Sequence, residues 1–221
     1  MPVQRPIDPA LHLLRDKILI MGGATENAIA RAVRSIVERD SSLAQQVIRD
    51  DDRIDRLELE IDELCIDTLV LQQPTASDLR FVVGVAKTAP NIERIADHAV
   101  NIAKHALAVN NEPQLKNYVD LPRMGGIVQE MLVAGLDAFT AVDSDRAWAV
   151  IRRDDEVDVL YRAISDDLQR LMTDEPSTVT RAVQLLFVAK HLERIADYVT
   201  NICELVVYMK RGSVIKHVFE E

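Results

Sequence analysis

The sequence predicts an all-α fold, built as two tandem three-helix bundles that are related by an internal duplication. Apolar residues recur at helical spacing along nearly the whole 221-residue chain. Aromatic residues contribute only 4% and there are only 7 glycines, whereas an all-β fold needs many aromatic strands and tight turns. Two stretches of the first half also recur in the second half. Together these observations favour helices arranged in two similar units.

The apolar periodicity predicts three helices in each half. The first helix is expected over residues 11–37, and the turn at residues 40–42 supplies the N-cap of a second helix that ends near residue 72. Ser77 or Asp78 is expected to cap a third helix that reaches Val109. In the second half, helices are expected over residues 123–142, 145–171 and 177–210, and Gly212 is the expected C-terminal stop.

Glycine and proline mark special positions within this pattern. Gly22 and Gly23 lie inside the first helix at a propensity cost of about 1 kcal/mol each, which predicts close contact with a neighbouring helix. Pro90 lacks a backbone N–H and should kink or interrupt the third helix. The polar segment 110–122 contains two prolines and is interpreted as the linker between domains 1–112 and 113–221.

Composition excludes several classes of protein. The net charge of −10 and the pI of about 5.0 argue against a nucleic-acid-binding role. Two cysteines cannot form a disulfide framework or, by themselves, a zinc site. No uncharged apolar run approaches the length of a transmembrane helix, and the N-terminus lacks the apolar segment of a secretion signal. A cytoplasmic location is therefore expected.

The internal repeat is the most informative feature of the sequence. Residues 92–97, Ile-Glu-Arg-Ile-Ala-Asp, recur as Leu-Glu-Arg-Ile-Ala-Asp at residues 192–197, and the match extends to Asn101 and Asn201. A second match pairs residues 47–57 with residues 150–160 and preserves three aspartates in each copy. The two halves are therefore interpreted as two copies of one three-helix unit.

In each copy, two helices carry an acidic residue that is followed by an aspartate four positions later. Positions i and i+4 share a helical face, and each pair borders the apolar face of its helix. The two pairs lie at nearly equal distances from the turn that joins their helices, so an antiparallel hairpin brings four carboxylates together in each bundle. These are Asp51, Asp55, Glu93 and Asp97 in the first copy, and Asp154, Asp158, Glu193 and Asp197 in the second.

Converging carboxylates repel one another unless a proton, a basic side chain or a metal ion lies among them. Carboxylate oxygens without cysteine suit hard cations such as Fe³⁺, Mn²⁺ or Mg²⁺. A single acidic pair is typical of a solvated helix face, and Arg94 or Arg194 could neutralise its neighbours. Four pairs, in register and preserved through a duplication, favour a metal site instead. Glu58 and Asp62 have no acidic counterparts in the second copy and are interpreted as solvated.

These motifs resemble the PhoU family, the accessory proteins of phosphate transport systems. The resemblance rests on the duplicated Glu-Arg-Ile-Ala-Asp-x-x-x-Asn-Ile stretches, on residues 72–80 (Gln-Gln-Pro-Thr-Ala-Ser-Asp-Leu-Arg) and on the Asp-x-x-x-Asp helices. It implies two three-helix bundles and multinuclear iron, or else manganese, magnesium or zinc, on the eight carboxylates given above. Asn101 and Asn201 extend the stripes as weaker ligand candidates. Pro90 departs from the family pattern, and a kink there would rotate the first acidic pair.

The resemblance also implies a function. Proteins of this family act as negative regulators of phosphate uptake and of the phosphate-starvation (Pho) response when phosphate is plentiful. They link the ATPase of the phosphate ABC transporter to a sensor histidine kinase, and they are not enzymes. A homodimer that is at most peripheral to the membrane is expected.

Two other functions stay open on the residues alone. A carboxylate-bridged di-metal centre could serve a hydrolase or phosphatase, although the sequence contains no accompanying histidine ligand set and no Glu-x-x-His motif. A metal-free helical scaffold would leave the carboxylates solvated. Three histidines near the motifs are interpreted as surface or packing residues, and the two cysteines as small apolar side chains on buried helix faces. These are His98, His105, His191, Cys65 and Cys203.

Overall fold

A computed structural model describes residues 5–115 and 120–212, and these residues form helices without any strand. The first half contains α1 (Asp8–Val37), α2 (Ser41–Asp50), α3 (Asp52–Gln72) and α4 (Ala76–Asn110). The second half contains α5 (Asp120–Ala141), α6 (Ser144–Ile151), α7 (Asp154–Asp174), the 3₁₀ turn η1 (Pro176–Thr178) and α8 (Val179–Arg211). The predicted all-α class is confirmed.

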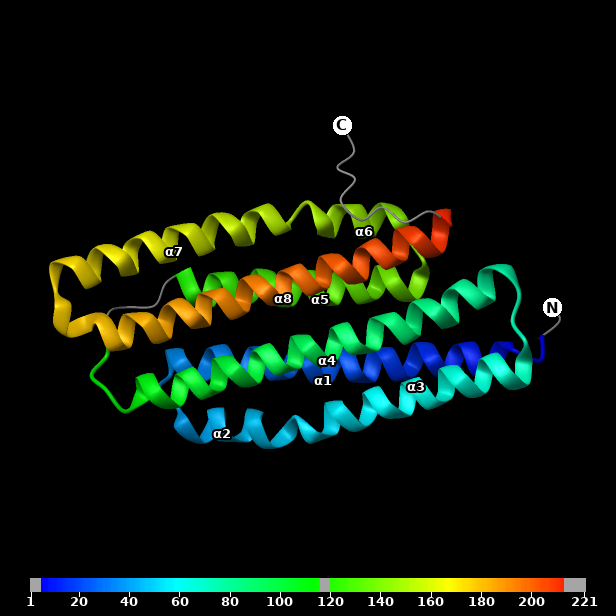
Figure 1. Ribbon diagram of the computed structural model, residues 1–221, viewed down its shortest axis with the longest axis horizontal. Helices are drawn as coiled ribbons and strands as arrows, with labels where there is room; N and C mark the ends of the chain where they lie inside the picture. The colour runs from blue at the N-terminus through cyan, green and yellow to red at the C-terminus, as the bar shows by residue number, and fades with distance from the viewer. Residues whose placement is uncertain (1–4, 116–119, 213–221) are drawn as a thin grey trace.

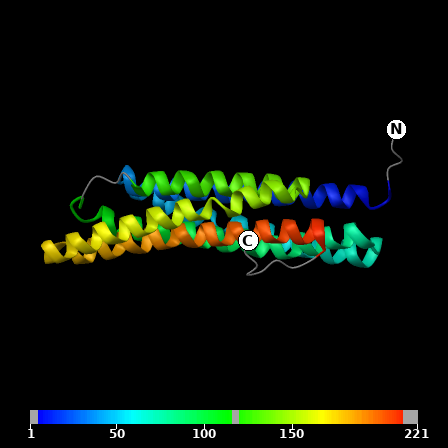
Figure 2. The same cartoon turned by 90° about the horizontal axis from the view of Figure 1, so that it is seen from above.

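Each half is a three-helix bundle whose second helix is divided into two consecutive shorter helices. In the first bundle α2 and α3 follow one another beside α1 and α4, and in the second α6 and α7 follow one another beside α5 and α8 (Figure 1). The bundles pack side by side, with α4 against α8 and α1 against α5. Seen from above, α1 and α5 form one layer of an elongated molecule and the other long helices form the second (Figure 2).

One apolar core runs through both bundles, and close packing between them confirms one of the glycine predictions. A Cβ atom on Gly22 of α1 would lie 2.1 Å from Leu136 Cδ1 of α5, so a larger residue at this position would force the Leu136 side chain to move. Gly23 has no atom within 4 Å of its Cβ position and makes no such contact. Cys65 and Cys203 are buried in the core, as expected for small apolar side chains.

The middle helix of each bundle is broken where the sequence predicts a continuous helix. α2 ends at Asp50 and α3 starts at Asp52, while α6 ends at Ile151 and α7 starts at Asp154. The apolar periodicity continues across both breaks, so it does not reveal them. Acidic residues crowd the first turns of α3 and α7. This placement is favourable because free backbone N–H groups and the helix dipole attract negative charge at a helix N-terminus.

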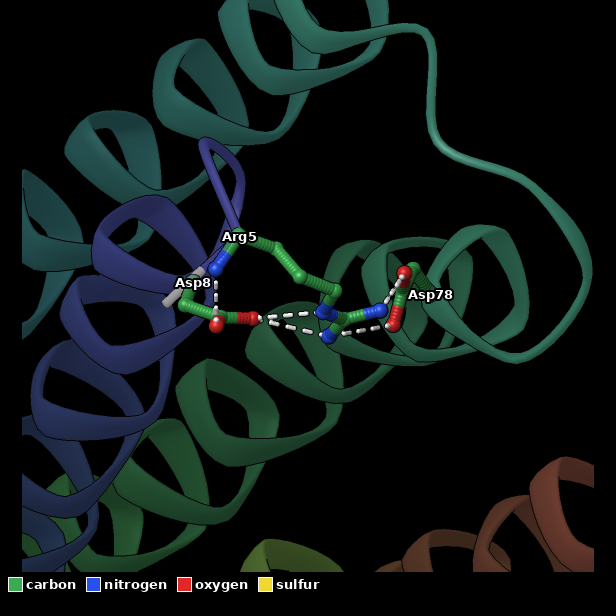
Figure 3. Close-up of polar contacts among 3 residues, drawn as sticks. All are labelled: Arg5, Asp8 and Asp78. Atoms are coloured by element: carbon green, nitrogen blue, oxygen red, sulfur yellow. Dashed lines mark hydrogen bonds and ion pairs between the residues drawn. The ribbon is translucent and has the colours of Figure 1, made fainter. Parts of the chain in front are cut away.

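Two details at the ends of α4 and α8 test the predicted caps. The N-cap of α4 is Thr75, not Ser77 or Asp78. Asp78 instead accepts a hydrogen bond of 2.7 Å from Arg5, which also donates to Asp8 and so ties the start of α1 to the start of α4 (Figure 3). Gly212 ends α8 in the left-handed region with φ of 74°, as predicted.

Pro90 does not interrupt its helix, because α4 is continuous from Ala76 to Asn110. The predicted linker at residues 110–122 is shorter than expected, since α5 already begins at Asp120. Part of that linker, residues 116–119, lies outside the described residues. No helix in the described ranges is long and apolar enough to cross a membrane.

Candidate functional site

The first acidic cluster lies where α4 passes beside the start of α3. Its members are Asp51, Asp55, Glu58, Glu93 and Asp97. Asp51 lies at the junction of α2 and α3, and Asp55 follows in the first turn of α3. Glu93 and Asp97 lie about one turn apart in the middle of α4, which packs against α3. The short turn between α3 and α4 makes the two helices antiparallel and brings the acidic pairs to one level.

The charges of this cluster act on one another across the two helices. Burial, followed by the charges of Asp55 and Asp97, raises the pKa of Asp51 to about 6, and Lys104 partly opposes this shift. Burial, followed by the charges of Asp97 and other carboxylates of the cluster, raises the pKa of Glu93 to about 7. Each shift includes a contribution from the other helix. The charges of the carboxylates that loop counting places together therefore interact across the two helices.

Glu58 also belongs to this cluster, although the sequence argument assigns it to solvent. The side chain is half-buried on α3, and its charge raises the pKa of Glu93. Burial, followed by the charges of Asp55 and Asp62, raises the pKa of Glu58 itself. Its counterpart in the second copy is Tyr161, so a search for residues common to both copies discards it. Spacing alone identifies it, because Glu58 continues the i, i+3 and i+4 pattern of Asp51 and Asp55.

The second acidic cluster occupies the equivalent place in the second bundle, and its members are Asp154, Asp158, Glu193 and Asp197. Asp154 and Asp158 lie in the first turns of α7, while Glu193 and Asp197 lie in the middle of α8. Burial, followed by the charges of Asp197, Asp158 and Glu193, raises the pKa of Asp154 to about 7. Carboxylates of both helices therefore converge here as well.

The two clusters differ in how far basic side chains neutralise them. Lys190 Nζ lies 2.6 Å and 2.7 Å from the two carboxylate oxygens of Glu193 and lies over the ring of Tyr161. The counterpart of Lys190 in the first copy is Pro90, which carries no charge, and the counterpart of Tyr161 is Glu58. The first cluster thus has one more carboxylate and no equivalent of the Lys190–Glu193 ion pair, although the charge of Lys104 acts on Asp51. The sequence argument on Pro90 addresses only helix geometry and misses this electrostatic difference.

The donor atoms of both clusters fit a hard cation. They are carboxylate oxygens held on helices, and burial, followed by mutual repulsion, raises the pKa of Asp51, Glu93 and Asp154. A bound cation would replace that repulsion with attraction. In their present conformations, however, no three His, Cys, Asp or Glu side chains of the described residues are close enough to share a metal ion. Metal binding at the eight predicted positions therefore stays a prediction and requires side-chain rotation.

The remaining candidates are two asparagines, each one helical turn beyond a cluster aspartate, and the histidines. Asn201 lines a groove between α4 and α8 together with Tyr198, and Asn101 is half-buried on α4. The rings of His98 and His191 meet across the α4–α8 contact, with Nδ1 atoms 2.9 Å apart. Burial and the neighbouring histidines lower the pKa of His191 to about 4. This ring therefore packs between the bundles in its neutral form.

Comparisons with known proteins agree with this architecture. The sequence profile of the PhoU domain matches residues 18–106 and 121–206, one match in each bundle. A phosphate-specific transport system accessory protein PhoU homolog from Pseudomonas aeruginosa is 36% identical over 98% of this chain and 90% of its own length.

Solved structures give the same result. The crystal structure of PhoU from Pseudomonas aeruginosa superposes with a TM-score of 0.89 at 37% identity and covers 93% of this chain and 99% of its own. The crystal structure of the phosphate transport system regulatory protein PhoU from Streptococcus pneumoniae gives a TM-score of 0.89 at 32% identity and covers 94% of this chain and 98% of its own. The likeness thus extends over both bundles and the contact between them.

Proposed function

Because the chain belongs to the PhoU family, we propose that it is an accessory regulator of phosphate transport. It acts as a negative regulator of phosphate uptake and of the phosphate-starvation response when phosphate is plentiful. In this role it contacts the ATPase of a phosphate ABC transporter and a sensor histidine kinase from the cytoplasm. The observation that carries the proposal is the full-length likeness to phosphate-specific transport accessory proteins, which spans both copies of the repeat.

We further propose that each acidic cluster holds a cation, with iron the first candidate and manganese, magnesium or zinc as alternatives. The support is the donor chemistry and the convergence of carboxylates from two helices in each bundle. In this proposal Glu93 and Asp97 of α4 share a cation with the carboxylates of α3. Glu193 and Asp197 of α8 share one with the carboxylates of α7. A cation bound between these helices would tie the divided second helix of each bundle to the central pair α4 and α8.

A reporter strain tests the regulatory role. The gene for this chain is deleted, and a phosphate-starvation promoter drives a fluorescent protein during growth in excess phosphate. The proposal predicts high reporter signal in the deletion strain and repression when the full chain is restored. A deletion strain that keeps the reporter silent in excess phosphate contradicts the regulatory role.

Capture of partners tests the proposed linkage separately. The full chain is purified under mild conditions from phosphate-replete cells, and the bound proteins are probed with antibodies against the transporter ATPase and the sensor kinase. Recovery of both partners supports the linkage. Recovery of neither, from cells in which both are expressed, contradicts it.

A further inference from the structure

A groove of about 650 Å³ runs along the seam where α4 and α8 pack against each other. Small-molecule sites in proteins have similar volumes. The groove is lined among others by Lys87, Pro90 and Arg94 of α4 and by Tyr198, Asn201 and Tyr208 of α8. None of the eight predicted metal-ligand carboxylates lines it.

The internal duplication shows that this half of the seam differs from the other half. Helices α4 and α8 are equivalent copies at an offset of 100 residues, so Lys87 and Leu205, which both line the groove, correspond to Phe187 and His105. The rings of Phe187 and His105 stack with centroids 5.3 Å apart. At the groove, a lysine and a leucine occupy these two positions and provide no stacked pair of rings.

The neighbouring positions repeat this difference. His98 and His191 meet with Nδ1 atoms 2.9 Å apart, and their counterparts Tyr198 and Asn91 line the groove instead. Stacked rings therefore fill one half of the seam, whereas the equivalent half is open as a groove whose wall combines apolar side chains and tyrosine rings with a few polar groups. Packing between the bundles does not require the hollow half, because the same helices close the other half with side chains.

Several polar groups in the groove form no hydrogen bond or ion pair with the described residues. Lys87 forms no ion pair there, and its ammonium lies 5.9 Å from the ring centroid of Tyr208. The amide of Asn201 makes no hydrogen bond to another described residue. Pro90 has no N–H, so the carbonyl of Ala86 lacks its usual helical donor. The groove thus offers a ligand three groups: the ammonium of Lys87, the amide of Asn201 and the backbone carbonyl of Ala86.

The chemistry changes along the length of the groove. Lys87 and Arg94 are seven residues apart on one helix, which corresponds to about 10 Å. The guanidinium carbon of Arg94 lies 5.9 Å from the ring centroid of Tyr198, and both planar groups offer surfaces for stacking. Glu204 lies on the groove wall without a hydrogen bond or an ion pair to the described residues. Its carboxylate, next to Leu205 and close to the level of Lys87, accepts hydroxyl donors.

We propose that this groove binds a nucleoside monophosphate. Lys87 binds the phosphate as a compact cation. The ribose hydroxyls donate to the Ala86 carbonyl and to Glu204. The base stacks against Arg94 and Tyr198, and the Asn201 amide bonds to its edge. A bare phosphate would use only the lysine end, and an uncharged nucleoside would leave that lysine unpaired.

Calorimetric titration of AMP into the full chain tests the proposal. A chelator is present, so that phosphate cannot bind through a cation held by the acidic clusters, and the outcome is independent of the proposed metal sites. One AMP per chain is expected, with adenosine and inorganic phosphate each binding at least tenfold more weakly. Absence of AMP binding at millimolar concentration overturns the proposal, as does inorganic phosphate binding as tightly as AMP.

Matched variants locate the site. Lys87→Gln is expected to weaken AMP binding at least tenfold, and Lys87→Phe, which restores the residue of the filled half, should abolish it. Lys210→Gln removes the same charge from the end of α8 outside the groove and should change affinity less than twofold. Circular dichroism melting confirms that each variant is folded. Equal affinities for the Lys87 and Lys210 variants overturn the assignment.

Discussion

At the scale of single residues, the acidic clusters make proton binding part of folding. Burial and neighbouring carboxylates favour the neutral forms of Asp51, Glu93 and Asp154, whose pKa values rise to about 6, 7 and 7. The folded chain therefore binds these protons more tightly than the unfolded chain. Their contribution to stability is fully present below the ordinary pKa values near 4, and it is lost as the pH rises through about 7.

Replacing Asp154 by asparagine should show this effect directly. In metal-free buffer at pH 8, Asp154→Asn is expected to raise the free energy of unfolding by about 1 kcal/mol, a value that allows for screening of a half-buried charge. At pH 4 the difference should disappear, because the carboxylate of the native protein is then neutral. Urea denaturation at both pH values provides the measurement. Asp166→Asn, an exposed residue about three turns further along α7, is the control and should have little effect at either pH.

Lys190 should set the cation affinity of the second cluster. Its ammonium group neutralises Glu193 and competes with a metal ion for the same oxygen atoms. Lys190→Gln is therefore expected to lower the Kd for Mn²⁺ by about fivefold, the effect of one nearby charge in a high-dielectric surrounding. Electron paramagnetic resonance measures free Mn²⁺ during the titration. Tighter binding in a Lys210→Gln control, equal to that of the Lys190 variant, would show that only net charge matters.

At the scale of helices, local sequence explains much but not all of the structure. The caps at Asp40, Asp143 and Gly212 and the positions of the long helices follow from residue type and apolar spacing. The breaks before α3 and α7 do not, because buried residues continue at helical spacing on both sides. At Pro90 the sequence predicts a kink or break, but α4 is continuous, because tertiary packing keeps the helix intact at a residue that disfavours it.

Replacing Pro90 by alanine measures the free-energy cost of proline inside α4, which tertiary packing offsets in the native protein. Pro90→Ala restores an N–H for the Ala86 carbonyl and should raise the free energy of unfolding by about 1–2 kcal/mol, less than the full propensity difference because the helix is already formed. Pro122→Ala provides the control in the first turn of α5, where proline is tolerated, and should change stability by less than about 0.5 kcal/mol. Chemical denaturation at one pH compares the two. Destabilisation by Pro90→Ala would contradict this account of α4.

At the scale of the whole molecule, the duplication predicts each bundle but not the contact between the bundles. Counting residues from the short turn between α3 and α4 predicts that Asp51 and Asp55 lie level with Glu93 and Asp97, because the two pairs are equally far from that turn. The pairing of α4 with α8 joins residues about one hundred positions apart, and no local pattern specifies it. The ring contact of His98 with His191 and the groove beside Lys87 both arise at that contact. A search for residues shared by the two copies also misses Glu58 and Lys190, because each occurs in one copy only.

Metal content tests the central claim, that carboxylates on neighbouring helices converge to hold a cation in each bundle. The full chain is purified without chelator, and elemental analysis gives the metal bound per chain. A variant with Glu93→Gln, Asp97→Asn, Glu193→Gln and Asp197→Asn provides the comparison. The account predicts at least one bound metal ion per chain in the native protein and none in the variant. Native protein that is free of metal, with an unfolding midpoint unchanged by excess Mn²⁺, would contradict it, because binding to the folded state alone must raise stability.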